Sequence, residues 1–155
     1  MMQIQLSQKE RMLLEDEKSQ EEVCEIKYQN YSNQAQDPQL KQLFQTLSTE
    51  EHHHYDMLNQ MLQGQQPNMQ HNPAQGTTPT QQSTYQGAMG NTGDKILCSD
   101  LLSTEKFVSS AYNTGIFEAA NPTVRQALQH IQQDEQKHGE QLFNYMNSHG
   151  MYQVQ

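Results

Sequence analysis

Apolar residues recur at alternating spacings of three and four positions in four stretches of the chain, a spacing that lines one face of an α-helix. The pattern predicts helices at about residues 8–36, 38–63, 94–119 and 122–148. Residues 64–93 are rich in Gly, Pro, Gln, Thr and Asn, lack an apolar period, and predict a flexible crossover. We therefore expect residues 1–155 to form a single all-α domain.

Short capping signals mark where the predicted helices begin and end. Ser7 and Glu10 have the spacing of a capping box, in which each side chain caps the other residue's backbone N–H. Asp37 and Asn121 are each followed by a proline, which joins a side-chain cap to a residue suited to the first helical turn. Gly150 follows the last helix. The tight turns predict two helical hairpins.

The two halves of the chain repeat each other at an offset of 84 positions, the difference between Asp37 and Asn121 in the two turns. The matched pairs include Glu21 with Glu105, Tyr28 with Tyr112, Glu51 with Glu135, and His54 with His138. Two matched hairpins joined by a long crossover predict a four-helix bundle with pseudo-two-fold symmetry.

Each predicted helix carries a carboxylate in its apolar seam. The seams of the second and fourth helices are apolar except for one Glu and, three residues later, one His. The first and third helices each contribute a matching Glu, although Glu17 also breaks the seam of the first. The seam residues at matching levels are Glu21, Glu51, His54, Glu105, Glu135 and His138.

Four carboxylates at one level of a core are costly to bury unless a positive group lies between them. No Lys or Arg occupies a seam position near that level. Two helices with one Glu each, and two with Glu-x-x-His, form the ligand set of di-iron carboxylate bundles. Oxygen ligands with one imidazole per metal favour iron and also suit manganese or zinc. The sequence thus predicts two divalent metal ions; the alternative is a vestigial, metal-free site whose glutamates are protonated, water-linked or turned outward.

The sequence predicts the roles of the tyrosines, the cysteines and the remaining histidines less specifically. Tyr28 and Tyr112 each follow their seam glutamate by two helical turns, and either fill the core or orient a metal ligand by a hydrogen bond. Cys24 and Cys98 are too few for a disulfide framework and are expected to be small core residues. Histidines off the seams are expected at the surface, namely His52, His53, His130 and His149.

Composition and charge exclude several classes of function. The formal charge of −9, from 9 basic and 18 acidic residues, argues against a nucleic-acid partner. No run of about 18 apolar residues is present, so no membrane span is expected. The first residues lack the apolar core of a signal peptide and predict a helix start instead.

The order of the seam residues resembles rubrerythrin, a member of the ferritin-like superfamily. Rubrerythrin-type domains pair a helix Glu with a Tyr seven residues later, followed by Glu-x-x-His on the next helix, and this order occurs twice over about 120 residues here. The resemblance implies a ferritin-like fold with the six seam residues as metal ligands. The four-cysteine iron module of rubrerythrin has no counterpart, so a self-sufficient peroxidase is not expected.

The second half, from Cys98 to Tyr152, resembles the spore coat F family of endospore-forming bacteria. It does so through Asp-Leu-Leu, Glu-Lys-Phe, Tyr-Asn, Phe-Glu, Asn-Pro, Leu-Phe and a closing Gly-Met-Tyr, where the family usually has Gly-Trp-Tyr. The resemblance implies a structural protein of the spore coat, assembled from the mother-cell cytoplasm beside other coat proteins. The family motif does not require the metal ligands, which this chain retains.

Two functions therefore follow from the resemblances. The first is a spore coat-associated ferritin-like protein that keeps a di-metal carboxylate site. The alternative is a rubrerythrin-like di-iron or di-manganese oxidase or peroxidase that protects against peroxide or handles iron. Ferritin-like bundles often dimerise, so a homodimer is compatible with either function. No residue pattern names a catalytic residue, a substrate or an electron donor.

Overall fold

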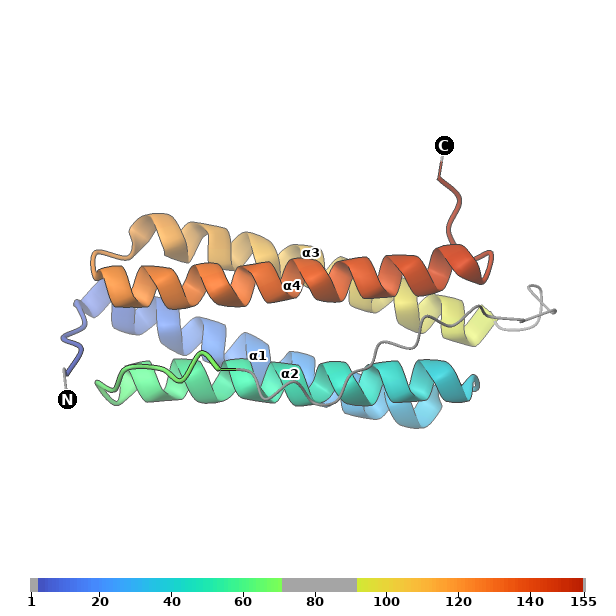
Figure 1. The fold of residues 1–155 in the computed structure, drawn as a ribbon, viewed down its shortest axis with the longest axis horizontal. Helices are drawn as coiled ribbons and strands as arrows, with labels where there is room; N and C mark the ends of the chain where they lie inside the picture. Colours follow the sequence, from blue (N-terminus) through green and yellow to red (C-terminus); the bar gives the residue numbers. More distant parts are fainter. Residues whose placement is uncertain (1–2, 71–91, 155) are drawn as a thin grey trace.

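The computed structural model describes residues 3–70 and 92–154, and these residues form four helices and no strand. The helices are α1 (Gln8–Gln34), α2 (Pro38–Leu62), α3 (Thr92–Glu118) and α4 (Pro122–Ser148). Helix α1 packs along α2 and α3 packs along α4, so the expected all-α arrangement of two hairpins is confirmed (Figure 1). Most of the predicted crossover, residues 71–91, lies outside the described residues.

The helix ends carry the predicted caps. Ser7 Oγ accepts a hydrogen bond from the Glu10 N–H at 3.0 Å, and the Glu10 carboxylate accepts one from the Ser7 N–H at 2.8 Å. The side chains of Asp37 and Asn121 accept hydrogen bonds from the first turns of α2 and α4. Gly150 has a φ of 70°, the left-handed conformation that glycine adopts most readily after a helix.

Two carboxylates hold the hairpins in register, and they occupy equivalent positions of the repeat. Asp94, in the first turn of α3, accepts hydrogen bonds from the N–H groups of Gln36 and Asp37 at 2.9 and 3.1 Å. Glu10, in the first turn of α1, accepts one from the Asn121 N–H at 2.8 Å. Each hairpin therefore holds the turn of the other, which brings the middles of all four helices to the same level.

The apolar core forms two clusters, separated by a polar layer. One cluster contains Leu14, Leu58 and Leu128, and the other contains Phe44 and Leu142. These side chains are buried, as the seam spacing predicts. The polar layer between the clusters contains the seam glutamates and histidines, so hydrophobic packing on both sides determines its position.

Not every off-seam histidine lies at the surface. His52 is exposed and His53 and His130 are partly buried, but the surface prediction was wrong for His149, which is 3% exposed. The His149 ring stacks on Tyr145 with 3.9 Å between centroids. His149 is buried because the C-terminal end of α4 packs against the start of α2, where Asp37 contacts the ring.

Candidate metal centre

The six predicted ligand residues meet in the middle of the bundle. They form two groups in which one ligand atom from each residue lies within 4.8 Å of the others. The groups are Glu21, Glu51, His54 and Glu135, and Glu51, Glu105, Glu135 and His138. Glu51 and Glu135 belong to both groups, and all six side chains are buried. The site therefore has two overlapping halves that share two carboxylates.

Helical geometry explains why α2 and α4 each supply two of these residues. Residues three positions apart lie on the same face of a helix, so Glu51 and His54 both point inward from α2. The repeat places Glu135 and His138 on the inner face of α4 in the same way. The two imidazole rings lie 5.8 Å apart between centroids, one from each hairpin.

Each histidine directs Nδ1 towards the glutamates. His54 Nδ1 lies 2.9 Å from Glu135 Oε1, and His138 Nδ1 lies 2.6 Å from Glu51 Oε1. The remaining distances from each Nδ1 to the carboxylates of its own group are 3.6 to 3.9 Å. Nδ1 is therefore the ring atom available to a metal ion on each side.

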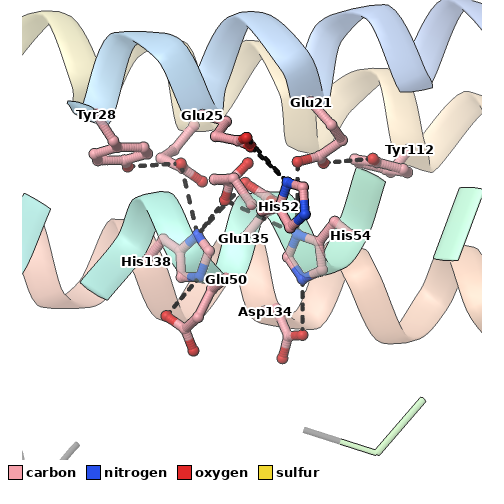
Figure 2. Close-up of polar contacts among 12 residues, drawn as sticks. Glu21, Glu25, Tyr28, Glu50, His52, His54, Tyr112, Asp134, Glu135 and His138 are labelled. Carbon is pink, nitrogen blue, oxygen red and sulfur yellow. Dashed lines mark hydrogen bonds and ion pairs between the residues drawn. The ribbon is translucent and has the colours of Figure 1, made fainter. Parts of the chain in front are cut away.

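The outer nitrogen of each histidine contacts a carboxylate that the sequence reasoning did not assign to the site (Figure 2). His54 Nε2 lies 3.0 Å from Asp134 Oδ2, and His138 Nε2 lies 3.2 Å from Glu50 Oε2. Asp134 and Glu50 each come directly before a Glu-x-x-His and are equivalent in the repeat. A carboxylate behind a metal-bound histidine fixes the tautomer and the orientation of the ring.

The two tyrosines cross between the hairpins. Tyr28 Oη donates a hydrogen bond to Glu105 at 2.8 Å, and Tyr112 Oη donates one to Glu21 at 2.5 Å. Each tyrosine thus contacts the glutamate of the opposite hairpin, not the one on its own helix. Figure 2 shows this contact for Tyr112 and Glu21. The geometry places both hydroxyls behind a candidate ligand, and their role in orienting a bound metal stays a prediction.

Burial and crowding control the charges in this layer. Burial and the neighbouring charge of Glu135 raise the pKa of both Glu51 and Glu105 well above the usual range of a carboxyl group. Burial alone would lower the pKa of His54 and His138, but the surrounding carboxylates raise it well above its usual value. Without a metal ion the layer therefore balances its charge by holding protons, which a cation would displace.

Buried carboxylate oxygens that lack hydrogen bonds indicate whether the site could accept a pair of metal ions. Within the described residues, neither oxygen of Glu51 or Glu135 has a hydrogen bond of regular geometry, and the Oε2 atoms of Glu21 and Glu105 also lack one. Buried polar atoms without such partners are uncommon in proteins. These oxygens lie in a layer of carboxylate and imidazole groups at mutual distances that suit metal ligands, so the residues fit two divalent cations.

The two cysteines are buried free thiols, as predicted. Burial, together with the charges of Glu21, Glu135 and Glu105, raises the pKa of the Cys24 thiol. Burial and the charges of Asp94 and Asp37 raise the pKa of Cys98 to about 12. Both therefore stay protonated near neutral pH and act as small core residues.

Comparisons with known proteins match part of the chain. Residues 93–155 match the family model of the Coat F domain, a range that includes the ligand candidates of α3 and α4. The chain is also 32% identical over 62 residues to YusN, an uncharacterised protein of Bacillus subtilis (strain 168). That similarity covers 40% of this chain and 56% of YusN, so the chain spans little more than half of this relative. No solved structure matches the chain.

The Coat F match supports the resemblance of the second hairpin to the spore coat F family. Among the helices that the structure describes, none combines the length and the apolar character needed to cross a membrane.

The outer carboxylates lead to a direct prediction about affinity. Replacing Asp134 by asparagine removes the charge behind His54 while keeping the shape of the side chain. We expect metal affinity to fall by about 10- to 100-fold, the usual effect of losing such a partner. Titration of the metal-free protein with Mn²⁺ measures the change. Asp56→Asn, on the exposed side of α2, is the matched control, and an unchanged affinity for Asp134→Asn would rule out the assigned role.

Proposed function

We propose that this protein is a spore coat-associated protein of the ferritin-like type, a structural coat component that holds two divalent metal ions within its bundle. The observation that carries the metal site is the pair of buried ligand groups that share Glu51 and Glu135. The match of residues 93–155 to the Coat F domain supports the location, with other coat proteins as partners.

The chain's own residues divide the work of holding the metals. Glu51 and Glu135 would help to hold both ions, since each belongs to both groups. Glu21 with His54 would complete one side, and Glu105 with the second histidine would complete the other. A bound iron or manganese pair would supply Lewis acidity and redox chemistry. The surrounding apolar clusters exclude water and keep the carboxylates in place.

The coat assignment has its own test, because it does not depend on metal. A tagged copy expressed in the native endospore-forming organism should appear in the coat fraction of purified spores. Deletion of the gene should alter or remove a coat layer in electron micrographs. The Glu51→Gln variant should still reach the coat if the role there is structural. A protein found only in the cytosol of vegetative cells would refute the assignment.

A second candidate function is a rubrerythrin-like oxidase or peroxidase. Each ligand group contains four residues, whereas iron and manganese accept up to about six ligands, so room remains for a small oxidant. An external electron donor is needed because the chain has only two cysteines, both within helices. Metal-loaded protein supplied with a reductant should consume peroxide faster than Glu51→Gln, and equal rates would exclude this activity.

A further inference from the structure

We propose that divalent cations reach the centre through a cleft between α2 and α4, on the side of His138, and that Glu50 is the carboxylate that moves to admit them. The inference rests on the proposed metal site. It concerns the route and order of loading, which the ligand set does not determine.

The cleft lies on the outer side of the histidine layer and has a volume of about 250 Å³. Its walls are Glu50 of α2 and, from α4, Asp134, Lys137, His138, Glu140 and Gln141. Figure 2 shows Glu50 and Asp134 on the far side of the two imidazole rings from the tyrosines and Glu21. The cleft therefore adjoins one candidate ligand directly, with no other helix between them.

At the inner end of the cleft, the outer nitrogen of His138 has a longer carboxylate contact than that of His54. The His138 ring is 2% exposed, and Nε2 lies 3.2 Å from Glu50 without hydrogen-bond geometry. On the other side, His54 Nε2 and Asp134 form a hydrogen bond of 3.0 Å. The Glu50 side chain is 33% exposed, whereas that of Asp134 is 8% exposed. Glu50 can therefore swing into solvent more readily than Asp134.

Charge favours this face over the opposite one. Three acidic side chains line the cleft, against two basic residues, Lys137 and His138. The face between α1 and α3 is bridged by Lys27, whose ammonium group contacts Asp100 at 2.8 Å and Thr104 at 2.9 Å. A cleft with excess negative charge attracts cations and raises their rate of arrival, whereas a lysine opposes it.

The position of the cleft also determines an order of filling. An ion that passes Glu50 first meets the group that contains His138 and Glu105. The second group is reached through Glu51 and Glu135, which belong to both. The His138 side should therefore fill before the His54 side.

The test measures how fast metal-free protein takes up Co²⁺ after rapid mixing at low salt. Glu140→Gln should slow the uptake about threefold and Lys137→Gln should speed it about threefold, because neither residue is a candidate ligand and each contributes one charge to the cleft. Both effects should shrink at high salt, where exposed charges are screened. The final Co²⁺ content should equal that of the unaltered protein. Glu22→Gln, on the exposed side of α1, is the matched control.

The outcomes separate the route from the site. Rates for Glu140→Gln and Lys137→Gln that equal the control, with two Co²⁺ ions still bound, would overturn the route and leave the proposed metal site standing. His138→Gln leaves the His54 group as the intact ligand group. If this variant took up its Co²⁺ faster than the unaltered protein fills its first site, the route would also be overturned. Failure of the unaltered protein to bind Co²⁺ would instead refute the proposed function itself.

Discussion

We expect that replacing Glu51 by glutamine removes both metal ions of the proposed centre, whereas replacing Glu21 by glutamine removes only one. The reason is that Glu51 belongs to both ligand groups and Glu21 belongs to one. A neutral amide lacks the negative charge with which the carboxylate would hold the cations. Both variants should fold, because glutamine keeps the volume of the side chain, and burial already raises the pKa of Glu51 well above its usual range in the metal-free protein.

Metal content per chain after reconstitution and removal of unbound ions measures this difference. Glu22→Gln should retain both ions, since this neighbouring glutamate is exposed on α1. Thermal unfolding with and without metal adds a second measurement: ions that bind only the folded state stabilise it by about 2.7 kcal/mol at 100 times the dissociation constant. Equal losses in Glu51→Gln and Glu21→Gln would contradict the shared-ligand arrangement.

Replacing Glu17 by leucine stabilises the metal-free protein by about 3 kcal/mol at pH 7. Glu17 is 2% exposed, and neither carboxyl oxygen has a hydrogen bond within the described residues. Burial, with the charges of Glu21 and Asp16, raises its pKa from 4.5 to about 9. The equivalent position of the repeat is Leu101, so a leucine occupies the matching seam position of the other hairpin.

The pH dependence has a definite sign. The folded-state pKa of Glu17 lies above the unfolded value, so folding favours the protonated form and incurs no ionisation penalty below about pH 4.5. The penalty grows as the pH rises from 4.5 towards 9, because the unfolded chain ionises first. The gain from Glu17→Leu should therefore increase over this range. Urea unfolding in the presence of a chelator at several pH values measures it, with Glu15→Gln as the exposed control.

A constant gain across the pH range would show that Glu17 is ionised in the folded protein or has a partner there. The carboxyl group lies against Gly115, where an added Cβ would come within 2.5 Å of Glu17 Oε1. The glycine therefore provides the space that the carboxyl group occupies. The equivalent position in the other half of the bundle is Tyr31, which shows that the repeat is not symmetric around this residue.

The helices and the six ligand candidates could be predicted because they depend on spacing within single helices. Seam positions follow from the periodicity, and the repeat identified which Glu and His pair belongs to the inner face. Only His54 of the three consecutive histidines has a histidine counterpart, His138, and both are buried. The capping signals were equally local, so the turns at Asp37 and Asn121 also followed from the sequence.

Contacts between hairpins could not be predicted in the same way. The partners of Tyr28 and Tyr112 depend on how the helices are rotated and how far apart they lie, which no spacing within a helix specifies. The same holds for the carboxylates Glu50 and Asp134 behind the histidines. A signal for these two did exist, since an acid precedes each Glu-x-x-His at equivalent positions. His149 was misplaced because its burial depends on the start of α2, far away in the sequence.

Elemental analysis of the protein purified without a chelator tests the central claim most directly. Four buried carboxylates and two imidazoles in overlapping groups should hold two divalent ions per chain, with iron favoured by the ligand set. Glu51→Gln purified in parallel should contain almost none. Less than about one ion per chain in the unaltered protein, together with equal stability of the two proteins, would contradict the proposed metal site.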